Sequence, residues 1–165
     1  MKNKVNDIIE FINIFDEVII DIISSEKYKN MDKFIQHGKT SCFCHSIAVA
    51  YYSFKFFEFF GIKYDVKSLI KGALLHDYFL YDWHENDKSH RLHGFRHPKT
   101  ALKNAMRDFN INVVEKNIIE RHMFPLTLIP PKYRESVVVC LVDKGCSIYE
   151  TFNKGAYSEL KNIGV

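Results

Sequence analysis

Apolar residues recur every three to four positions along most of the chain, which is the spacing that places them on one face of an α-helix. The first such stretch covers residues 5–23 and is interrupted by acidic residues. It therefore predicts an amphipathic helix rather than a membrane-spanning one. We expect this N-terminal helix, over residues 3–25, to pack on a core formed by residues 36–151.

Further stretches with the same spacing predict more helices, and glycine, proline and small polar residues mark their ends. They cover residues 28–36, 42–60, 65–81, 98–109, 113–123 and 133–148. Gly38 and Gly61 are placed to end two of these helices in the left-handed conformation. Thr40 or Ser41 could cap the helix that starts at residue 42. Pro98 suits the first position of its helix.

The segments between these helices are predicted to be connections. Residues 82–96 are polar and aromatic without a helical period, which predicts a loop over the functional site. Residues 124–132 contain three prolines and must be a connection. Residues 136–140 are β-branched enough for one short strand. The favoured fold is a single all-α domain over residues 1–165, built as a bundle of about six to eight helices.

Composition supports a folded protein and narrows the classes of partner. Hydrophobic residues make up 47% of the 165 residues and aromatic ones 15%, which is enough for a sizeable core. The net charge of +3 is spread along the chain, so we expect neither a long nucleic acid nor a membrane as partner. The aromatic cluster over residues 51–60 is mostly core, with a surplus that could serve a homodimer interface. The four cysteines form no Cys-x-x-Cys motif and predict reduced thiols in a cytoplasmic protein.

Side chains of the kinds that bind metals lie in or beside the apolar helices. They are His45, the adjacent pair His76 and Asp77, His97, His122 and Asp143. Apart from the pair, about one helix and its connection separates each from the next, which indicates a site built between helices. Imidazole and carboxylate together suit divalent iron, manganese, nickel, cobalt or zinc, whereas calcium takes oxygen ligands alone.

Each of these residues also has a plainer explanation. A single histidine on an apolar helix is usually a core or surface histidine, as we expect for His84, His90 and His93. The His76-Asp77 pair could be a hydrogen-bonded helix end. The joint pattern favours metal binding, because an unpaired polar group in an apolar interior costs about 1–3 kcal/mol.

The order of these six residues resembles the HD-domain superfamily of metal-dependent phosphohydrolases, named for an adjacent His-Asp pair. The resemblance covers residues 36–151 and is closest to small, largely uncharacterised bacterial members; the His97-Pro98 step is similar to one in binuclear members. It implies an HD-domain helical bundle that binds two divalent cations, drawn from Fe, Mn, Ni, Co, Zn and Mg. The implied ligands are His45, His76, Asp77 and Asp143 for one metal and His97 and His122 for the second, with Asp77 as the bridge.

The resemblance also implies an enzyme that hydrolyses phosphomonoesters or phosphodiesters of a small phosphorylated metabolite or nucleotide. Aspartate suits a bridging position because its two oxygens can each bind one cation. Asp77 is therefore the expected catalytic residue, a bridging carboxylate that positions a metal-bound water.

Two departures from the superfamily's patterns limit what the resemblance implies. Members that cleave cyclic dinucleotides carry Gly-Tyr-Pro, whereas here Met123-Phe-Pro follows His122. Mononuclear nucleotidases of the superfamily carry a catalytic glutamate where this chain has Leu80. The substrate of neither subgroup can therefore be assigned to this chain.

Two other functions remain compatible with the same ligands. Some HD-domain proteins with four histidines and two aspartates are mixed-valence di-iron oxygenases, which require iron and consume oxygen. The chain could also be a non-catalytic module that binds metal or nucleotide, which the missing glutamate favours. Turnover of phosphate esters without oxygen would distinguish the hydrolase from both.

Basic residues near the ligands are the candidates for holding a phosphate, although each could equally be an ordinary surface charge. They are Lys39, Arg91, Arg96, Arg121 and Lys144, with Arg96 the first choice because it precedes His97. His37, His93 and Asp82 could orient the ligands or pass a proton to the leaving group.

Overall fold

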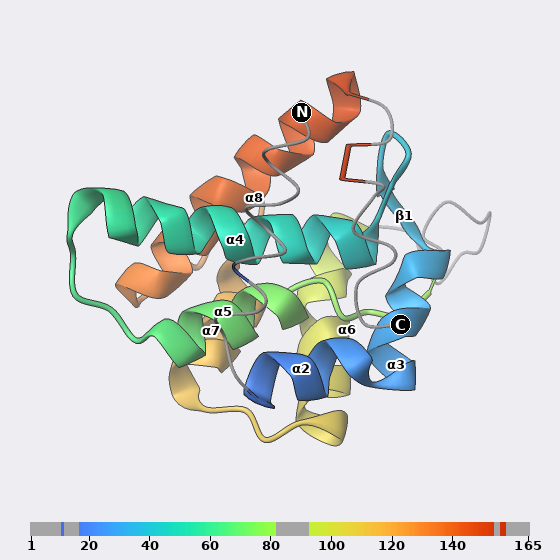
Figure 1. The fold of residues 1–165 in the computed structure, drawn as a ribbon, viewed down its shortest axis with the longest axis horizontal. Coiled ribbons are helices and arrows are strands. Elements are labelled where there is room, and N and C mark those ends of the chain that lie inside the picture. The colour runs from blue at the N-terminus through green and yellow to red at the C-terminus, as the bar shows by residue number, and fades with distance from the viewer. Residues whose placement is uncertain (1–10, 12–16, 82–92, 154–155, 158–165) are drawn as a thin grey trace.

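The computed structural model describes residues 11, 17–81, 93–153 and 156–157, and these form a helical bundle (Figure 1). In chain order the elements are α2 (Glu17–Ser24), α3 (Glu26–Lys29), the 3-10 helix η1 (Asn30–Lys33), β1 (Ile35–His37), β2 (Thr40–Ser41), α4 (Cys42–Phe60), α5 (Val66–Leu75), α6 (His93–Asp108), α7 (Val113–Arg121) and α8 (Arg134–Phe152). Within the described ranges, the short antiparallel hairpin β1–β2 is the only sheet. The predicted all-α class is confirmed.

Helix α4 is central to the bundle, and twelve of its nineteen residues are buried. It contacts α5 and α8, and α7 packs against both of these helices. Figure 1 shows α4 crossing the middle of the molecule between α8 and α5. Because the helix is covered on several sides, its sequence is apolar nearly all round rather than along one stripe.

The N-terminal end of the described chain packs on this core through α2. Ile19, Ile22 and Ile23 are buried, as the spacing of apolar residues predicts. The rest of the predicted helix over residues 3–25 lies largely outside the described residues. Among the helices that the structure describes, none combines the length and the apolar character needed to cross a membrane.

Several predicted helix ends are confirmed by their capping contacts. Ser41 caps α4, and its hydroxyl accepts a hydrogen bond from the backbone N–H of Cys44 at 3.3 Å. Gly61 ends α4 with a φ of 61°, the left-handed conformation that favours glycine. Asp65 caps α5 by accepting from the N–H of Ser68. These contacts fix the ends of the two helices that carry His45 and lead to His76.

The prediction of one helix over residues 28–36 is wrong. The helical part ends in η1 at Lys33, and the chain then forms the β1–β2 hairpin, with Gly38 in its turn at a φ of 59°. Four residues of helical turn are too few to reveal a period, so the short apolar run could not distinguish strand from helix. Conversely, residues 136–140 lie in α8 and form no strand.

Three helix boundaries differ from the prediction by four residues or more. α5 ends at Leu75 rather than residue 81, because the His76 ring bonds the carbonyl of Ala73 and the backbone turns away after it. α6 begins at His93, so Pro98 lies inside the helix and not at its first position. Residues 93–96 are therefore helical, and the predicted loop over 82–96 otherwise falls outside the described residues. α8 continues to Phe152, four residues past its predicted end.

The hairpin packs closely on the C-terminal end of α8. A Cβ atom at Gly38 would lie 2.5 Å from the backbone oxygen of Glu150, so only glycine fits there without a shift. The hydroxyl of Thr40 donates to the carbonyl oxygen of Ala156. This contact holds β1, and with it Gln36, beside the ends of α4 and α8.

Candidate metal centre

The structure brings together all six predicted metal ligands, which come from five different helices or their ends. His45 lies on α4, His76 and Asp77 follow α5, His97 lies on α6, His122 caps α7 and Asp143 lies on α8. All six are buried, with at most 6% of each residue exposed. They form two groups of three, each with candidate ligand atoms within 4.8 Å of one another.

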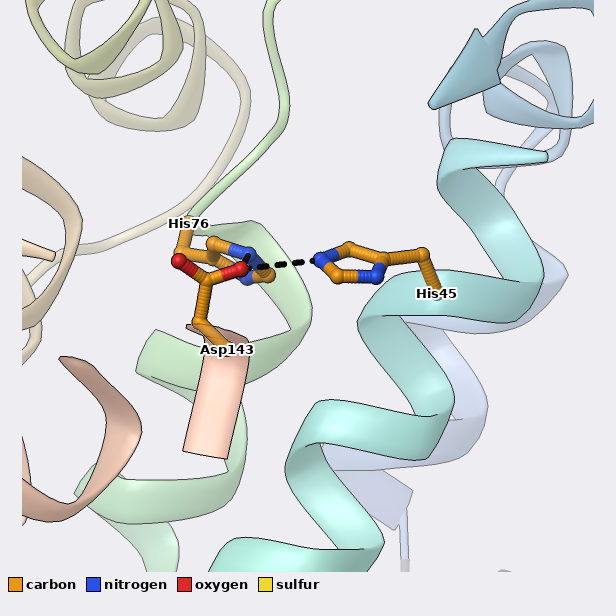
Figure 2. Close-up of side chains that lie close together, drawn as sticks. All are labelled: His45, His76 and Asp143. Carbon is orange, nitrogen blue, oxygen red and sulfur yellow. Dashed lines mark hydrogen bonds and ion pairs between the residues drawn. The ribbon is translucent and has the colours of Figure 1, made fainter. Parts of the chain in front are cut away.

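The first group consists of His45, His76 and Asp143. His45 Nε2 lies 3.1 Å from Asp143 Oδ1, and His76 Nε2 lies 3.7 Å from the same oxygen. Figure 2 shows His45 reaching from α4 toward Asp143 on α8 and His76 at the end of α5. Three helices therefore converge on one small volume.

The second group consists of Asp77, His97 and His122. His97 Nε2 and His122 Nε2 are 2.7 Å apart, and they lie 3.2 and 3.5 Å from Asp77 Oδ1. A neutral imidazole that donates through Nδ1 has a lone pair at Nε2. Two such nitrogens at this distance would repel each other unless a proton or a cation lay beside them.

Asp77 lies between the two groups and presents a different oxygen to each. Oδ1 faces His97 and His122, while Oδ2 lies 3.7 Å from His45 Nε2 and 3.4 Å from His76 Nε2. Oδ2 also accepts a hydrogen bond of 2.6 Å from Gln36 Nε2. One carboxylate thus connects both groups.

In three of the histidines, a hydrogen bond at Nδ1 leaves the other ring nitrogen, Nε2, facing the centre. His76 Nδ1 lies 2.6 Å from the carbonyl oxygen of Ala73, and His122 Nδ1 lies 2.8 Å from that of Ile119. Both rings cap a helix and bond the carbonyl three residues earlier. A carbonyl can only accept, so each Nδ1 carries the proton and each Nε2 offers its lone pair to the centre.

His45 is held in the same way by a carboxylate that the sequence analysis did not identify. Its Nδ1 lies 3.0 and 2.9 Å from the two carboxylate oxygens of Glu150, which is fully buried. Glu150 follows Asp143 by seven residues, which is two helical turns and therefore the same face of α8. That spacing was the signal available in the sequence. Gln36 was missed because its strand was predicted as helix.

The charges of the centre favour metal binding. Burial alone would raise the pKa of Asp77, but His76, His97 and His122 outweigh it and hold the pKa below its usual range. For Asp143 too, His45 and His76 outweigh burial and lower the pKa well below the usual value. Burial lowers the pKa of His122 to about 3, helped by His97 and His76. Two ionised carboxylates and a neutral His122 are the protonation states that a cation requires.

The pKa values of His45 and His76 shift the other way. Burial alone would lower both, but for His45 the charges of Glu150 and Asp143 raise the pKa well above its ordinary value. For His76, Asp77 and Asp143 do the same. The carboxylates therefore favour an extra proton on each of these two histidines. A bound cation would balance the same negative charge and take the place of those protons.

Two buried polar atoms in the middle of the centre indicate that a cation fits there. His76 Nε2 and Asp77 Oδ1 have no hydrogen-bond partner among the residues that the structure describes. A buried polar atom left in this way costs about 1–3 kcal/mol. Both atoms belong to the proposed ligand sets, and a divalent cation would satisfy them. The donor set of imidazole and carboxylate fits transition metals.

A cavity of about 650 Å³ opens onto the centre. Its lining includes Asp77, His97, His122 and Asp143, so a ligand in the cavity could reach both groups. His37 also lines it, with its ring 5.5 Å from that of His45, and burial together with the charge of His45 lowers the pKa of His37. This places one of the predicted orienting residues at the centre.

The predicted phosphate-holding residues do not gather there. Lys39 and Arg96 are exposed, and Arg121 pairs with Glu120 at 3.3 Å. Lys144 does line the cavity. Arg91 and Asp82 lie outside the described residues, and so does the side chain of His93. Arg96, the first choice from the sequence, is therefore not among the residues found at the cavity.

In comparison with known proteins, the chain matches no family model, no curated protein and no solved structure.

Proposed function

We propose that this protein is a metal-dependent phosphohydrolase that binds two divalent cations and cleaves the phosphate ester of a small phosphorylated metabolite or nucleotide. The position of Asp77 carries the proposal: each of its carboxylate oxygens faces a different pair of histidines, at 3.2 to 3.7 Å. This is the arrangement that a carboxylate bridging two cations needs. The resemblance of the residue order to the HD-domain superfamily supports the same function, and membership of that superfamily is part of the proposal.

The proposal gives a role to each group of residues in the centre. His45, His76 and Asp143 would hold one cation and His97 and His122 the other, with Asp77 shared. Bound divalent cations supply Lewis acidity and lower the pKa of water. Glu150 and the carbonyls of Ala73 and Ile119 keep the imidazole Nε2 atoms directed at the centre.

The overall reaction balances with water as the only co-reactant. For a monoester, a bond forms between the water oxygen and phosphorus, and the bond from phosphorus to the ester oxygen breaks. The ester oxygen leaves as an alcohol with a proton that the water loses, and inorganic phosphate is the second product. The buried aspartates stay ionised throughout, which matches their lowered pKa values.

Elemental analysis combined with a phosphate-release assay tests the proposal. We expect about two divalent cations per chain in protein purified without chelator. We also expect release of phosphate from small esters without oxygen, and loss of both properties in Asp77→Ala. Circular dichroism of the variant would check that it remains helical.

Two results would overturn the proposal. Iron in the centre with oxygen uptake and no phosphate release would assign the ligands to an oxygenase. A chain that binds no metal even after reconstitution would leave a helical binding module.

A further inference from the structure

The cavity at the metal centre is much larger than a phosphate group requires. Its volume of about 650 Å³ is in the range of pockets that hold a whole small molecule. The candidate ligands lie on one side, and Met123, Pro125 and Leu126 from the connection between α7 and α8 line another. A substrate with its phosphate at the metals would therefore place the rest of its body against an apolar wall.

The cavity offers little positive charge beyond the metal centre. Lys144 is the only lysine or arginine among the described residues that line it. Its Nζ donates to the carbonyl oxygens of His122 at 2.8 Å and Cys140 at 3.0 Å, and lies 3.3 Å from Cys140 Sγ. An ammonium group has three hydrogens to donate, so these contacts use them all. Lys144 thus holds the end of α7 in place. It has no hydrogen left to donate to a second or third phosphate of a substrate.

Two polar side chains on the remaining walls, those of Ser147 and Gln36, are also engaged within the protein. Ser147 donates to the carbonyl oxygen of Asp143 at 2.8 Å, and Gln36 donates to Asp77 at 2.6 Å. A substrate rich in hydroxyl groups would have to break these bonds to form its own. An apolar body would not, because it needs only contact and the removal of water.

The apolar wall is held at a defined position by its contact with the start of α6. A Cβ atom at Gly94 would lie 2.8 Å from Leu126 Cδ2 and 3.6 Å from Met123 Cε, so the glycine lets this wall approach closely. Leu126 nevertheless remains 44% exposed. Covering such apolar surface with an apolar ligand is favourable.

From these observations we propose that the substrate is a phosphomonoester with a single phosphate and an aliphatic or aromatic body, and not a nucleoside polyphosphate. This inference rests on the proposed hydrolase function, and it adds the part of the substrate that the apolar wall recognises. Met123, Pro125 and Leu126 determine specificity for that part, while the metal ligands bind the phosphate.

A series of alkyl phosphates tests the inference by turnover. From ethyl through butyl to hexyl phosphate, kcat/KM of the metal-loaded protein should rise about threefold per added methylene, close to the gain from burying one CH₂. Adenosine triphosphate should be the poorer substrate. Leu126→Ser should lower kcat/KM for hexyl phosphate by about tenfold and change that for ethyl phosphate by less than about twofold. Leu128→Ser is the matched control, since Leu128 is on the same connection, 89% exposed and not part of the lining.

Binding of phosphonates, which cannot be hydrolysed, separates this inference from the hydrolase proposal. Calorimetric titration should show tighter binding of hexylphosphonate than of ethylphosphonate, and Leu126→Ser should reduce the difference by about tenfold. If this pattern holds but no ester is cleaved, the hydrolase proposal fails and the apolar subsite stands. If esters are cleaved equally well whatever their chain, or adenosine triphosphate is preferred, the inference on the substrate is overturned and the hydrolase stands.

Discussion

His45 Nδ1 lies within 3.0 Å of both carboxylate oxygens of Glu150, and the two residues are completely buried. This contact fixes the orientation of the imidazole and increases the electron density at Nε2, the atom that faces the candidate metal centre. A carboxylate behind a metal-binding histidine commonly contributes to affinity without touching the cation. Glu150 is therefore a positioning residue of the centre.

Glu150→Gln should weaken metal binding by about 10- to 100-fold, because a neutral amide is a weaker acceptor for the Nδ1 proton. Competition with a chelator of known affinity measures the effect. Glu135→Gln is the matched control, since Glu135 is also buried on α8 but lies far from Glu150 along the helix. Its carboxylate accepts a hydrogen bond from the backbone N–H of Asp65. Equal metal affinity in the two variants would show that Glu150 serves only the packing of α8.

Asp77→Ala should lose both cations, because its two oxygens face different pairs of histidines. His122→Ala should lose only the cation held by His97 and His122. Elemental analysis after gel filtration gives the number of cations per chain in each variant. The same residual content in both would contradict a bridging role for Asp77.

Removal of the metals should lower the melting temperature. Cations that bind the folded chain at about a thousandfold above their dissociation constant stabilise it by about 4 kcal/mol, which corresponds to about 10 °C for a domain of this size. Differential scanning calorimetry before and after dialysis against a chelator measures the difference, and added metal should restore it. A melting temperature that does not change on chelation would argue against a cation bound in the core.

Gly38 and Gly61 both have left-handed backbones, and they provide a matched pair for testing how the hairpin is held. Gly61→Ala should cost about 1–2 kcal/mol for a φ of 61° alone, since nothing lies within 4 Å of the added methyl. Gly38→Ala should cost a further ~1–3 kcal/mol, because its Cβ would lie 2.5 Å from the backbone oxygen of Glu150. Urea unfolding measures both, and equal losses would show that the hairpin moves away from α8 without cost.

Asp108 should contribute to stability in a pH-dependent way. Arg107 and Lys27 each donate to it at 2.5 Å and Tyr78 at 3.1 Å, and despite partial burial, which acts the other way, these bonds hold the pKa of Asp108 below its usual range. The stabilisation is therefore fully present above the unfolded pKa of about 3.9 and is lost as the pH falls below it.

Comparing wild type with Asp108→Asn by urea unfolding tests this. The variant should be less stable by about 1 kcal/mol at neutral pH, a modest value because Arg107 and Lys27 are exposed. The difference should shrink at pH values well below 4. A gap that stays constant across the acid range would mean that the carboxylate charge contributes nothing.

The long helices could be predicted from the sequence because each combines a sustained period with clear end signals. The helix over residues 42–60 is an example, with Ser41 and Gly61 at its ends. The hairpin could not be predicted, since β1 and β2 are too short to show alternation. Nor could the early start of α6, where Pro98 fits one turn inside a helix although it is commoner at the first position.

The candidate metal ligands were predictable because histidine and aspartate are unusual at buried positions and occur in a recognisable order. The groups around them were less predictable. Glu150 lies two turns after Asp143 on the same face of α8, but its contact with His45 depends on how α8 crosses α4. Arg96 is next to His97 in sequence, but neighbouring helix residues point to different sides, and Arg96 is exposed.

The ligands of the centre are far apart along the chain, and His45 and Asp143 are separated by 98 positions in the sequence. A cation held by both would act as a non-covalent cross-link that closes a very long loop, and any helix that supplies a ligand could open only by giving up a bond to metal. Local fluctuations of α4, α5, α6, α7 and α8 would then become one shared event. Amide hydrogen exchange in all five helices should slow together when metal is added, including at residues distant from the centre.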